Sequence, residues 1–135
     1  MGAEDSSESS LSGGAPKAGP PTVLVADDSP VARYMLARRL RAEGFEIVEQ
    51  ETAALPAANV VTQIACALLD VDMGRGEDGR ELARQLRAVR ADLPVAFFSG
   101  SSDPAVLGSA REIGTVFWKP GELEQAVAWV RRQVG

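Results

Sequence analysis

The 135-residue sequence contains no histidine and only one cysteine, Cys66, and these two absences remove several classes of chemistry. Without histidine, neither Ser-His-Asp nor Cys-His catalysis is available. A single cysteine excludes an internal disulfide, and the two absences together argue against a zinc site. Cys66 lies in an apolar segment and is predicted to be a small core residue rather than a reactive thiol. Any chemistry must therefore use carboxylates, hydroxyls and lysine, with or without a metal ion.

The chain also lacks an excess of positive charge and any long apolar segment. Its 14 Lys and Arg residues are outnumbered by 19 Asp and Glu residues, for a formal net charge of −5, whereas a nucleic-acid-binding surface is basic. No segment approaches the roughly 20 apolar residues of a membrane helix. The N-terminus lacks the basic and apolar regions of a secretory signal. We therefore expect a cytoplasmic protein that binds neither nucleic acid nor a membrane.

The first 21 residues differ in composition from the rest of the chain. They are rich in Ser, Gly, Ala and Pro and hold almost no large apolar side chain. Such a segment buries too little surface to offset the entropy that it would lose on ordering. The sequence therefore predicts a disordered tail over residues 1–21 and one domain over residues 22–135.

From Thr22 onwards, segments with strand and helix patterns alternate. Apolar runs predict strands, and the amphipathic or capped segments between them predict helices. The predicted strands are 22–26, 45–49, 66–69, 95–98 and 115–118, and the predicted helices are 30–43, 52–62, 79–91, 103–113 and 121–134. This alternation implies an α/β fold with parallel strands joined by right-handed crossovers.

Polar residues follow or end four of these predicted strands. They are Asp27 with Asp28, then Asp70, Ser99 and Lys119. Because the carboxyl ends of parallel strands lie along one edge of a sheet, where ligands bind, we expect these side chains to converge. Crowded carboxylates repel each other unless a cation joins them, and Mg²⁺ prefers oxygen ligands of this kind. A cation beside a lysine would form a pocket for a phosphoryl group.

Taken together, these segments resemble the receiver domain of bacterial two-component response regulators, of the single-domain, chemotaxis-regulator-like type. The matching segments occur in family order within residues 22–134, and they are Val-Ala-Asp27-Asp28-Ser, Leu-Leu-Asp70-Val-Asp72-Met, Phe-Phe-Ser99-Gly and Lys119-Pro. The resemblance implies a flavodoxin-like, doubly wound α/β fold. Its five-stranded parallel sheet would have the strand order 2-1-3-4-5 and helices on both faces.

The resemblance also implies a phosphoacceptor and a metal site. Asp70 would attack a phosphohistidine carried by a histidine kinase or a phosphotransfer protein and form an acyl phosphate. Asp27, Asp28 and Asp70 would hold Mg²⁺, and the backbone carbonyl of Asp72 would complete the protein ligands. Such a protein catalyses its own phosphorylation and dephosphorylation but is not an enzyme in the usual sense.

Two further residues would contact the transferred group. Lys119 would pair with one phosphoryl oxygen, and the Ser99 hydroxyl would donate to another. The resemblance implies a signal passed to a downstream target by protein–protein contact, from a monomer or a weak dimer. Since the last predicted helix ends near Gly135, we expect a stand-alone receiver, with a piece of a longer regulator as the alternative.

Several positions depart from the family pattern. Gly74 stands where proline is common, and the loop 73–79 is about one residue longer than usual. Val116 stands where the family often has Tyr or Phe, and strand alternation points Phe117 to the opposite face. The segment 99–119 is about two residues short. These departures leave the phosphorylation chemistry in place and put the usual signalling switch in question.

Two other functions remain open. A pseudo-receiver would keep the fold and act as an interaction module that does not depend on phosphorylation. A haloacid-dehalogenase-like phosphatase would share the order Asp70-Val-Asp72, Ser99 and Lys119. However, the first aspartate of such a phosphatase belongs on an earlier strand, and its late acidic pair is missing from the predicted strands.

The two tryptophans give separate predictions. Trp118, in the last predicted strand, is expected to be a core residue. Trp129 lies off the apolar stripe of the last predicted helix, so it is either an exposed interface anchor or a ring packed on its own helix.

Overall fold

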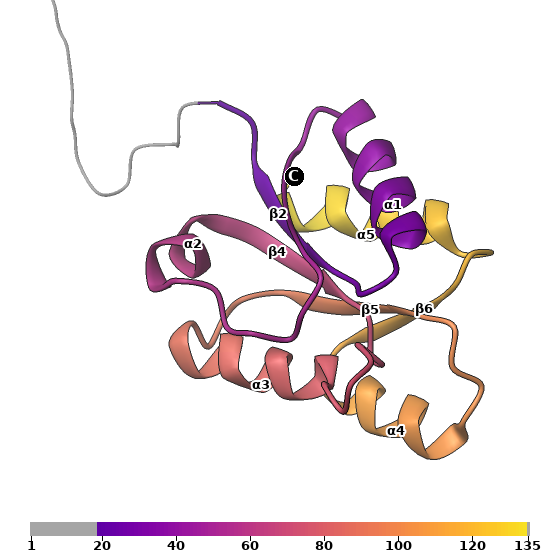
Figure 1. Ribbon diagram of the computed structural model, residues 1–135. Helices are drawn as coiled ribbons and strands as arrows, with labels where there is room; N and C mark the ends of the chain where they lie inside the picture. Colours follow the sequence, from indigo (N-terminus) through magenta and orange to yellow (C-terminus); the bar gives the residue numbers. More distant parts are fainter. Residues whose placement is uncertain (1–18, 135) are drawn as a thin grey trace, which may run out of the picture.

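A five-stranded parallel sheet forms the centre of the computed structural model, which describes residues 19–134 (Figure 1). The strands are β2 (Thr22–Ala26), β3 (Glu46–Gln50), β4 (Ile64–Leu69), β5 (Val95–Ser99) and β6 (Thr115–Trp118). They pair in the order β3-β2-β4-β5-β6, and every pair is parallel. In sequence order this is 2-1-3-4-5, so the predicted flavodoxin-like topology is confirmed.

The five helices cover both faces of the sheet. One face carries α1 (Pro30–Ala42) and α5 (Leu123–Val134), and the other carries α2 (Ala58–Gln63), α3 (Gly79–Val89) and α4 (Pro104–Ile113) (Figure 1). Each connection between neighbouring strands contains a helix, as parallel pairing requires. The doubly wound arrangement follows from this placement.

Strand alternation divides the core into two apolar layers, because successive side chains of a strand point to opposite faces. In β4, Cys66 and Leu68 pack toward α1 and α5, whereas Ala67 and Leu69 pack toward α2, α3 and α4. All four side chains are buried, and burial raises the pKa of the Cys66 thiol to about 12. Cys66 is therefore an inert core residue, as predicted.

Capping residues begin the helices that lead away from the carboxyl edge of the sheet. Ser29, Asp78 and Asp103 each accept a backbone hydrogen bond as the N-cap of α1, α3 and α4. These bonds satisfy amide groups that have no partner within the helix. After α1, Gly44 has a φ of 98°, which lets the chain turn sharply into β3.

The boundaries of some elements differ from the prediction. The strand predicted at 45–49 lies at Glu46–Gln50, and β4 begins two residues earlier than predicted, at Ile64. The helix predicted over 52–62 is shorter, since α2 spans only Ala58–Gln63. Pro56 lies in the extended segment before it, where the Gln50 side chain donates hydrogen bonds to the Thr52 and Ala54 carbonyl oxygens. These bonds stabilise a loop in place of two helical turns.

The structure contradicts the prediction for Trp118 and decides between the two alternatives for Trp129. Trp118 is 48% exposed, so its prediction as a core residue is wrong. It is the last residue of the edge strand β6, where no further strand covers it. Trp129 is only 8% exposed and packs in the layer beneath α1 and α5. Phe117 is buried in that same layer, on the face opposite Val116, as strand alternation predicted.

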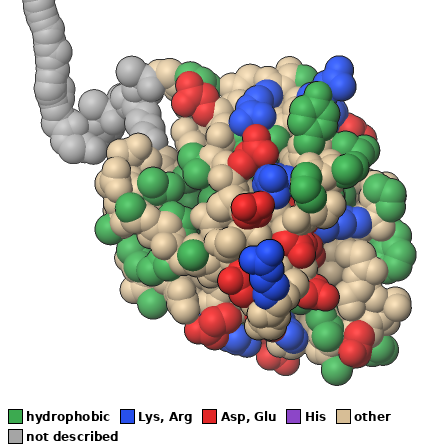
Figure 2. Space-filling view, in the orientation of Figure 1, with side chains coloured by type: hydrophobic (Ala, Val, Ile, Leu, Met, Phe, Trp, Pro, Cys, Tyr) green, Lys and Arg blue, Asp and Glu red, His purple; other side chains and the backbone are tan. Residues whose placement is uncertain are grey.

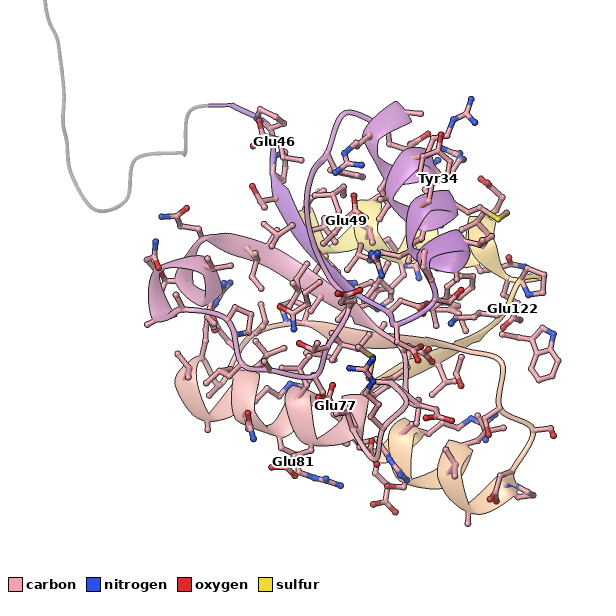
Figure 3. All side chains as sticks on the ribbon, in the orientation of Figure 1. Tyr34, Glu46, Glu49, Glu77, Glu81 and Glu122 are labelled. Atoms are coloured by element: carbon pink, nitrogen blue, oxygen red, sulfur yellow. The ribbon has the colours of Figure 1, made fainter. Side chains whose placement is uncertain are left out.

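The visible surface carries charged side chains in a band between apolar areas. Figure 2 shows Lys, Arg, Asp and Glu gathered along the middle of one face, with hydrophobic side chains to either side. Tyr34 projects from the exposed side of α1 (Figure 3) and is 59% exposed. Within residues 19–134, no helix is long and apolar enough to cross a membrane.

The tail predicted over residues 1–21 lies mostly outside the described residues, which begin at Gly19. The last residue of that segment is in contact with the sheet. The carbonyl oxygen of Pro21 accepts a hydrogen bond from the backbone N–H of Glu46, at 2.9 Å. The domain therefore begins to pair with β3 at Pro21.

Candidate functional site

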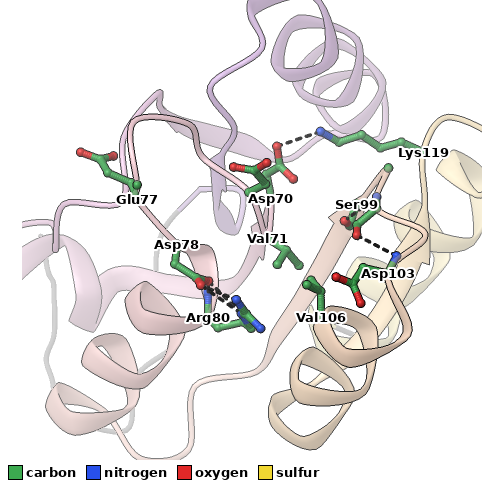
Figure 4. A pocket seen from close by; sticks show the side chains of 13 residues that line it. Asp70, Val71, Glu77, Asp78, Arg80, Ser99, Asp103, Val106 and Lys119 are labelled. Atoms are coloured by element: carbon green, nitrogen blue, oxygen red, sulfur yellow. Dashed lines mark hydrogen bonds and ion pairs between the residues drawn. The ribbon is translucent and has the colours of Figure 1, made fainter.

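The four strand ends singled out in the sequence meet at the carboxyl edge of the sheet. Figure 4 shows the side chains of Asp70, Ser99 and Lys119 there. Asp27 follows β2, Asp70 follows β4, Ser99 is the last residue of β5 and Lys119 follows β6. Parallel pairing of these strands places their last residues side by side. The predicted convergence is thus a direct consequence of the topology.

A single ammonium group joins two buried carboxylates at this edge. Lys119 Nζ lies 2.6 Å from Asp27 Oδ2 and 3.1 Å from Asp70 Oδ2. The side chains of Asp27, Asp70 and Lys119 are 3%, 9% and 17% exposed, respectively. Because little water reaches these groups, the charges interact more strongly than they would on an exposed surface.

Local hydrogen bonds hold the first aspartate in place. The backbone N–H of Ser29 donates to Asp27 Oδ1 at 2.9 Å. Arg33, one turn into α1, donates from Nη1 to the backbone carbonyl oxygen of Asp27 at 2.7 Å. Asp27 is therefore oriented on both sides by the first turn of α1, which begins at Pro30.

Negative charge exceeds positive charge within the cluster. Asp27, Asp28 and Asp70 each offer a carboxylate oxygen within 4.8 Å of the others, whereas Lys119 supplies the one ammonium paired with Asp27 and Asp70. Burial raises the pKa of Asp70 to about 6, and the charge of Asp27 adds to the rise, although Lys119 opposes it. Burial lowers the pKa of Lys119, but its bonds to the two aspartates outweigh this and leave the pKa raised.

The donor set fits a hard divalent cation. Three carboxylate oxygens that lie close together, one of them on the exposed Asp28, can be shared by one ion while water reaches its other positions. Mg²⁺ takes oxygen ligands and commonly keeps several waters. Such an ion would neutralise the excess negative charge of the cluster, which adds to the effect of burial on the pKa of Asp70.

A cavity of about 700 Å³ opens beside Asp70 and Lys119. Its wall comes from the β4–α3 loop, the end of β5 and the start of α4, and it includes Ser99, Gly100 and Val106. Figure 4 shows Ser99 facing the same space as Asp70. Ser99 Oγ accepts a hydrogen bond from the backbone N–H of Ser101 at 3.1 Å. The cavity can admit a phosphoryl group with part of its donor.

The side chain of Asp72 lies apart from the acidic cluster. It is exposed, and its Oδ1 accepts a hydrogen bond from the backbone N–H of Gly74 at 3.0 Å. Asp72 still lines the cavity beside Asp70. Its backbone carbonyl remains a predicted metal ligand.

Arg80 and Gly79 also belong to the site, although the sequence patterns did not indicate a role for them. Arg80, in the first turn of α3, lines the cavity and is joined to the Asp78 carboxylate by three hydrogen bonds (Figure 4). Only glycine fits at position 79, because an added Cβ would lie 1.8 Å from the backbone carbonyl oxygen of Asp70. The signal for Gly79 was its position directly after a helix cap. The ion pair of Arg80 with Asp78 is local, but only the tertiary structure places Arg80 beside the cavity.

Comparison with known proteins identifies a family and a fold for this chain. The family model described as the response regulator receiver domain matches residues 23–131. The transcriptional regulatory protein AruR of Pseudomonas aeruginosa is 36% identical in an alignment of 89 residues that covers 62% of this chain. The match spans 36% of the length of AruR, so it concerns about a third of that protein.

Solved structures agree on the fold. The signal receiver domain of NarL from Mycobacterium tuberculosis has a TM-score of 0.70 at 26% identity, over 87% of this chain and 98% of the other. A CheY-like receiver domain protein from Methanospirillum hungatei has a TM-score of 0.73 at 18% identity, over 86% of this chain and 94% of the other. The second likeness, at this low identity, concerns the fold alone.

Proposed function

The chain belongs to the response regulator receiver domain family of two-component systems, and on that premise we propose that Asp70 accepts a phosphoryl group in a Mg²⁺-dependent reaction. Receiver domains are signalling domains rather than enzymes in the usual sense. The observation that carries the proposal is the pairing of Lys119 with the buried carboxylates of Asp27 and Asp70, next to Asp28.

The proposed donor is a phosphohistidine on a histidine kinase or a phosphotransfer protein. An oxygen of the ionised Asp70 carboxylate forms a bond to phosphorus while the bond between phosphorus and the imidazole nitrogen breaks. The electron pair of the broken bond stays with the imidazole, and the product on this chain is an acyl phosphate. At neutral pH, Asp70 is mostly ionised because its pKa is about 6.

Asp27, Asp28 and Asp70 are the residues that would hold Mg²⁺, together with the backbone carbonyl of Asp72. When bound, the ion offsets negative charge on the transferring phosphoryl oxygens. Asp27 is already oriented by the Ser29 backbone N–H, so this carboxylate would need little rearrangement to serve as a ligand. The more exposed Asp28 would lie on the water-accessible side of the ion.

Lys119 and Ser99 would contact the phosphoryl group after transfer. The Lys119 ammonium already touches the acceptor carboxylate, so one of its donors can pass to a phosphoryl oxygen without a large movement. Ser99 Oγ accepts a bond from Ser101, which leaves the hydroxyl proton free for donation into the cavity. Both side chains line the cavity that contains Asp70.

The proposed partners are proteins. A cytoplasmic kinase or phosphotransfer protein would supply the phosphoryl group, and a downstream target would read the phosphorylated state by contact with this domain. We propose a monomer or a weak dimer. The matched part of AruR is only about a third of its length. The way in which this chain passes on its signal is therefore proposed from the receiver domain alone.

Incubation with acetyl phosphate and Mg²⁺, read by intact mass, tests the proposal. Wild type should gain the mass of one phosphoryl group, and chelation of the metal or Asp70→Asn should abolish the gain. Asp72→Asn is the matched control, because the exposed Asp72 would contribute a backbone carbonyl rather than its side chain. It should be phosphorylated like wild type.

The alternative of a phosphorylation-independent module has one observation in its favour. Val116 packs against the apolar layer under α2, α3 and α4, and a valine has no ring that could rotate between two positions. Absence of any mass gain in wild type, under conditions that phosphorylate another receiver domain, would favour that module. Repeated turnover of a phosphomonoester would favour a phosphatase instead.

A further inference from the structure

The β4–α3 loop, which contains Gly74, makes an unusual turn. Three consecutive residues have positive φ angles, with 74° at Gly74, 54° at Arg75 and 77° at Gly76. Residues other than glycine rarely adopt this conformation. The turn brings the backbone of the loop against the acidic cluster.

Gly74 and Gly76 share this conformation but differ in their surroundings. A Cβ added at Gly74 would lie 2.7 Å from Oδ2 of Asp28, closer than such atoms approach each other. A Cβ added at Gly76 would meet no described atom within 4 Å. The missing side chain of Gly74 therefore creates the space in which the Asp28 carboxylate lies.

Hydrogen bonds hold the loop at this place. The Gly74 N–H donates to Asp72 Oδ1 at 3.0 Å, and the Glu77 N–H donates to the Gly74 carbonyl oxygen at 2.8 Å. The Glu77 carboxylate accepts from the backbone N–H of Ala53 at 2.8 Å, which ties the loop to the segment after β3. Figure 3 shows Glu77 in this loop, beside the start of α3. If a side chain were added at Gly74, the exposed carboxylate of Asp28 would move before the hydrogen-bonded loop did.

We propose that Gly74 is a positioning residue for the metal site, because it lets the Asp28 carboxylate stay beside Asp27 and Asp70. The inference rests on the proposed function. It predicts that glycine at position 74 raises the affinity of the site for Mg²⁺. A carboxylate displaced from the trio would no longer lie within 4.8 Å of the other two.

Proline at this position would fail for two further reasons. Its ring requires a φ near −65°, whereas Gly74 has 74°. Proline also lacks the N–H that Gly74 donates to Asp72. Proline therefore could not replace Gly74 without changing the backbone conformation of this loop.

The test compares Mg²⁺ affinity in Gly74→Ala and Gly76→Ala, measured by calorimetric titration of the full chain. Both variants place a side chain at a positive φ, so in EDTA both should lose a similar amount of thermal stability. Gly74→Ala should bind Mg²⁺ about 10- to 100-fold more weakly than wild type, the usual effect of disturbing the support of a metal ligand. Gly76→Ala should stay within about twofold of wild type, since its added group meets no neighbour.

A double-mutant cycle shows whether Gly74 acts through Asp28. In an Asp28→Ala background the carboxylate that would clash is gone, so Gly74→Ala should weaken Mg²⁺ binding by no more than about twofold further. The same background should be insensitive to Gly76→Ala.

Two results would overturn the inference while the proposed function stands. One is an equal loss of Mg²⁺ affinity in Gly74→Ala and Gly76→Ala, in a wild type that binds Mg²⁺ and is phosphorylated. The other is a loss of Mg²⁺ affinity from Gly74→Ala that is as large in the Asp28→Ala background as in wild type. Failure of wild type to bind Mg²⁺ at all would instead reject the metal-dependent function, and the inference with it.

Discussion

The apolar layers of the sheet and its carboxyl edge are formed by the same strands, yet burial has opposite consequences in the two regions. Leu69 is fully buried at the end of β4, where its apolar surface leaves water and stabilises the fold. The next residue, Asp70, is 7% exposed, and burial raises its pKa to about 6. One peptide bond therefore separates a residue that stabilises the domain from one whose charged form destabilises it.

This contrast indicates what each region contributes. The buried apolar layers stabilise the folded state. Their contribution offsets the repulsion between the three carboxylates that lie together at the edge. Natural proteins commonly keep destabilising groups of this kind where activity needs them. Loss of a buried apolar side chain should therefore lower stability, whereas neutralising a carboxylate at the edge should raise stability and abolish function.

The largest effect is expected in the apolar layer. Phe97 is fully buried beneath α3 and α4, and Phe97→Ala would leave a cavity in addition to the lost apolar contact. We expect a loss of about 4 kcal/mol in the free energy of unfolding, measured by urea denaturation. A loss below about 1 kcal/mol would mean that the layer is not tightly packed and would weaken the comparison.

Removal of the bridging ammonium is expected to have the next largest effect. Lys119→Ala leaves Asp27 and Asp70 buried without the cation that joins them. In EDTA we expect a loss of about 2 kcal/mol, less than for a fully buried pair because Lys119 is 17% exposed. Addition of Mg²⁺ should restore much of the loss in thermal denaturation. An unchanged melting temperature in EDTA would show that the carboxylates tolerate each other without Lys119.

Neutralising the acceptor should stabilise the protein. The pKa of Asp70 is about 6 in the folded state and 3.8 in a model carboxyl group. The folded state therefore holds a proton that the unfolded state has lost, so stability falls as pH rises through this window. Above pH 6, in EDTA, Asp70→Asn should be about 1 kcal/mol more stable than wild type.

The pH dependence of that difference is the sharper measurement. The stability gain of Asp70→Asn should shrink as pH falls from 7 toward 4, because wild-type Asp70 then becomes neutral. Chemical denaturation at several pH values measures it. If Asp70→Asn increased the free energy of unfolding by the same amount at every pH from 7 to 4, the raised pKa of Asp70 would be contradicted.

The smallest effect is expected at Trp118. Its ring is 48% exposed at the edge of the sheet, so Trp118→Ala should change stability by no more than about 0.5 kcal/mol. Trp129→Ala is the control, since Trp129 is 8% exposed and should cost about 3 kcal/mol. Similar losses from the two substitutions would mean that Trp118 packs against the domain.

The sequence predicted the fold and the convergence of the strand ends because both depend on local patterns. The runs before Asp27 and Asp70 have the composition of buried strands, and the polar residue after each run marks the carboxyl end. Trp118 was predicted incorrectly because its exposure depends on which strand is at the edge. The start of α2 was also predicted incorrectly, since hydrogen bonds from the side chain of Gln50 stabilise a loop where the first turns were expected.

The sequence by itself determined which chemical groups stand at the strand ends, since strand pattern and residue type are local properties of the chain. Only the tertiary structure decided that Lys119 bridges Asp27 and Asp70, and that Gly74 lies against the Asp28 carboxylate. These contacts join residues that are far apart in the chain, and distances of a few ångströms between them depend on the packing of the whole sheet. Charge, burial and pKa at the site follow from those distances.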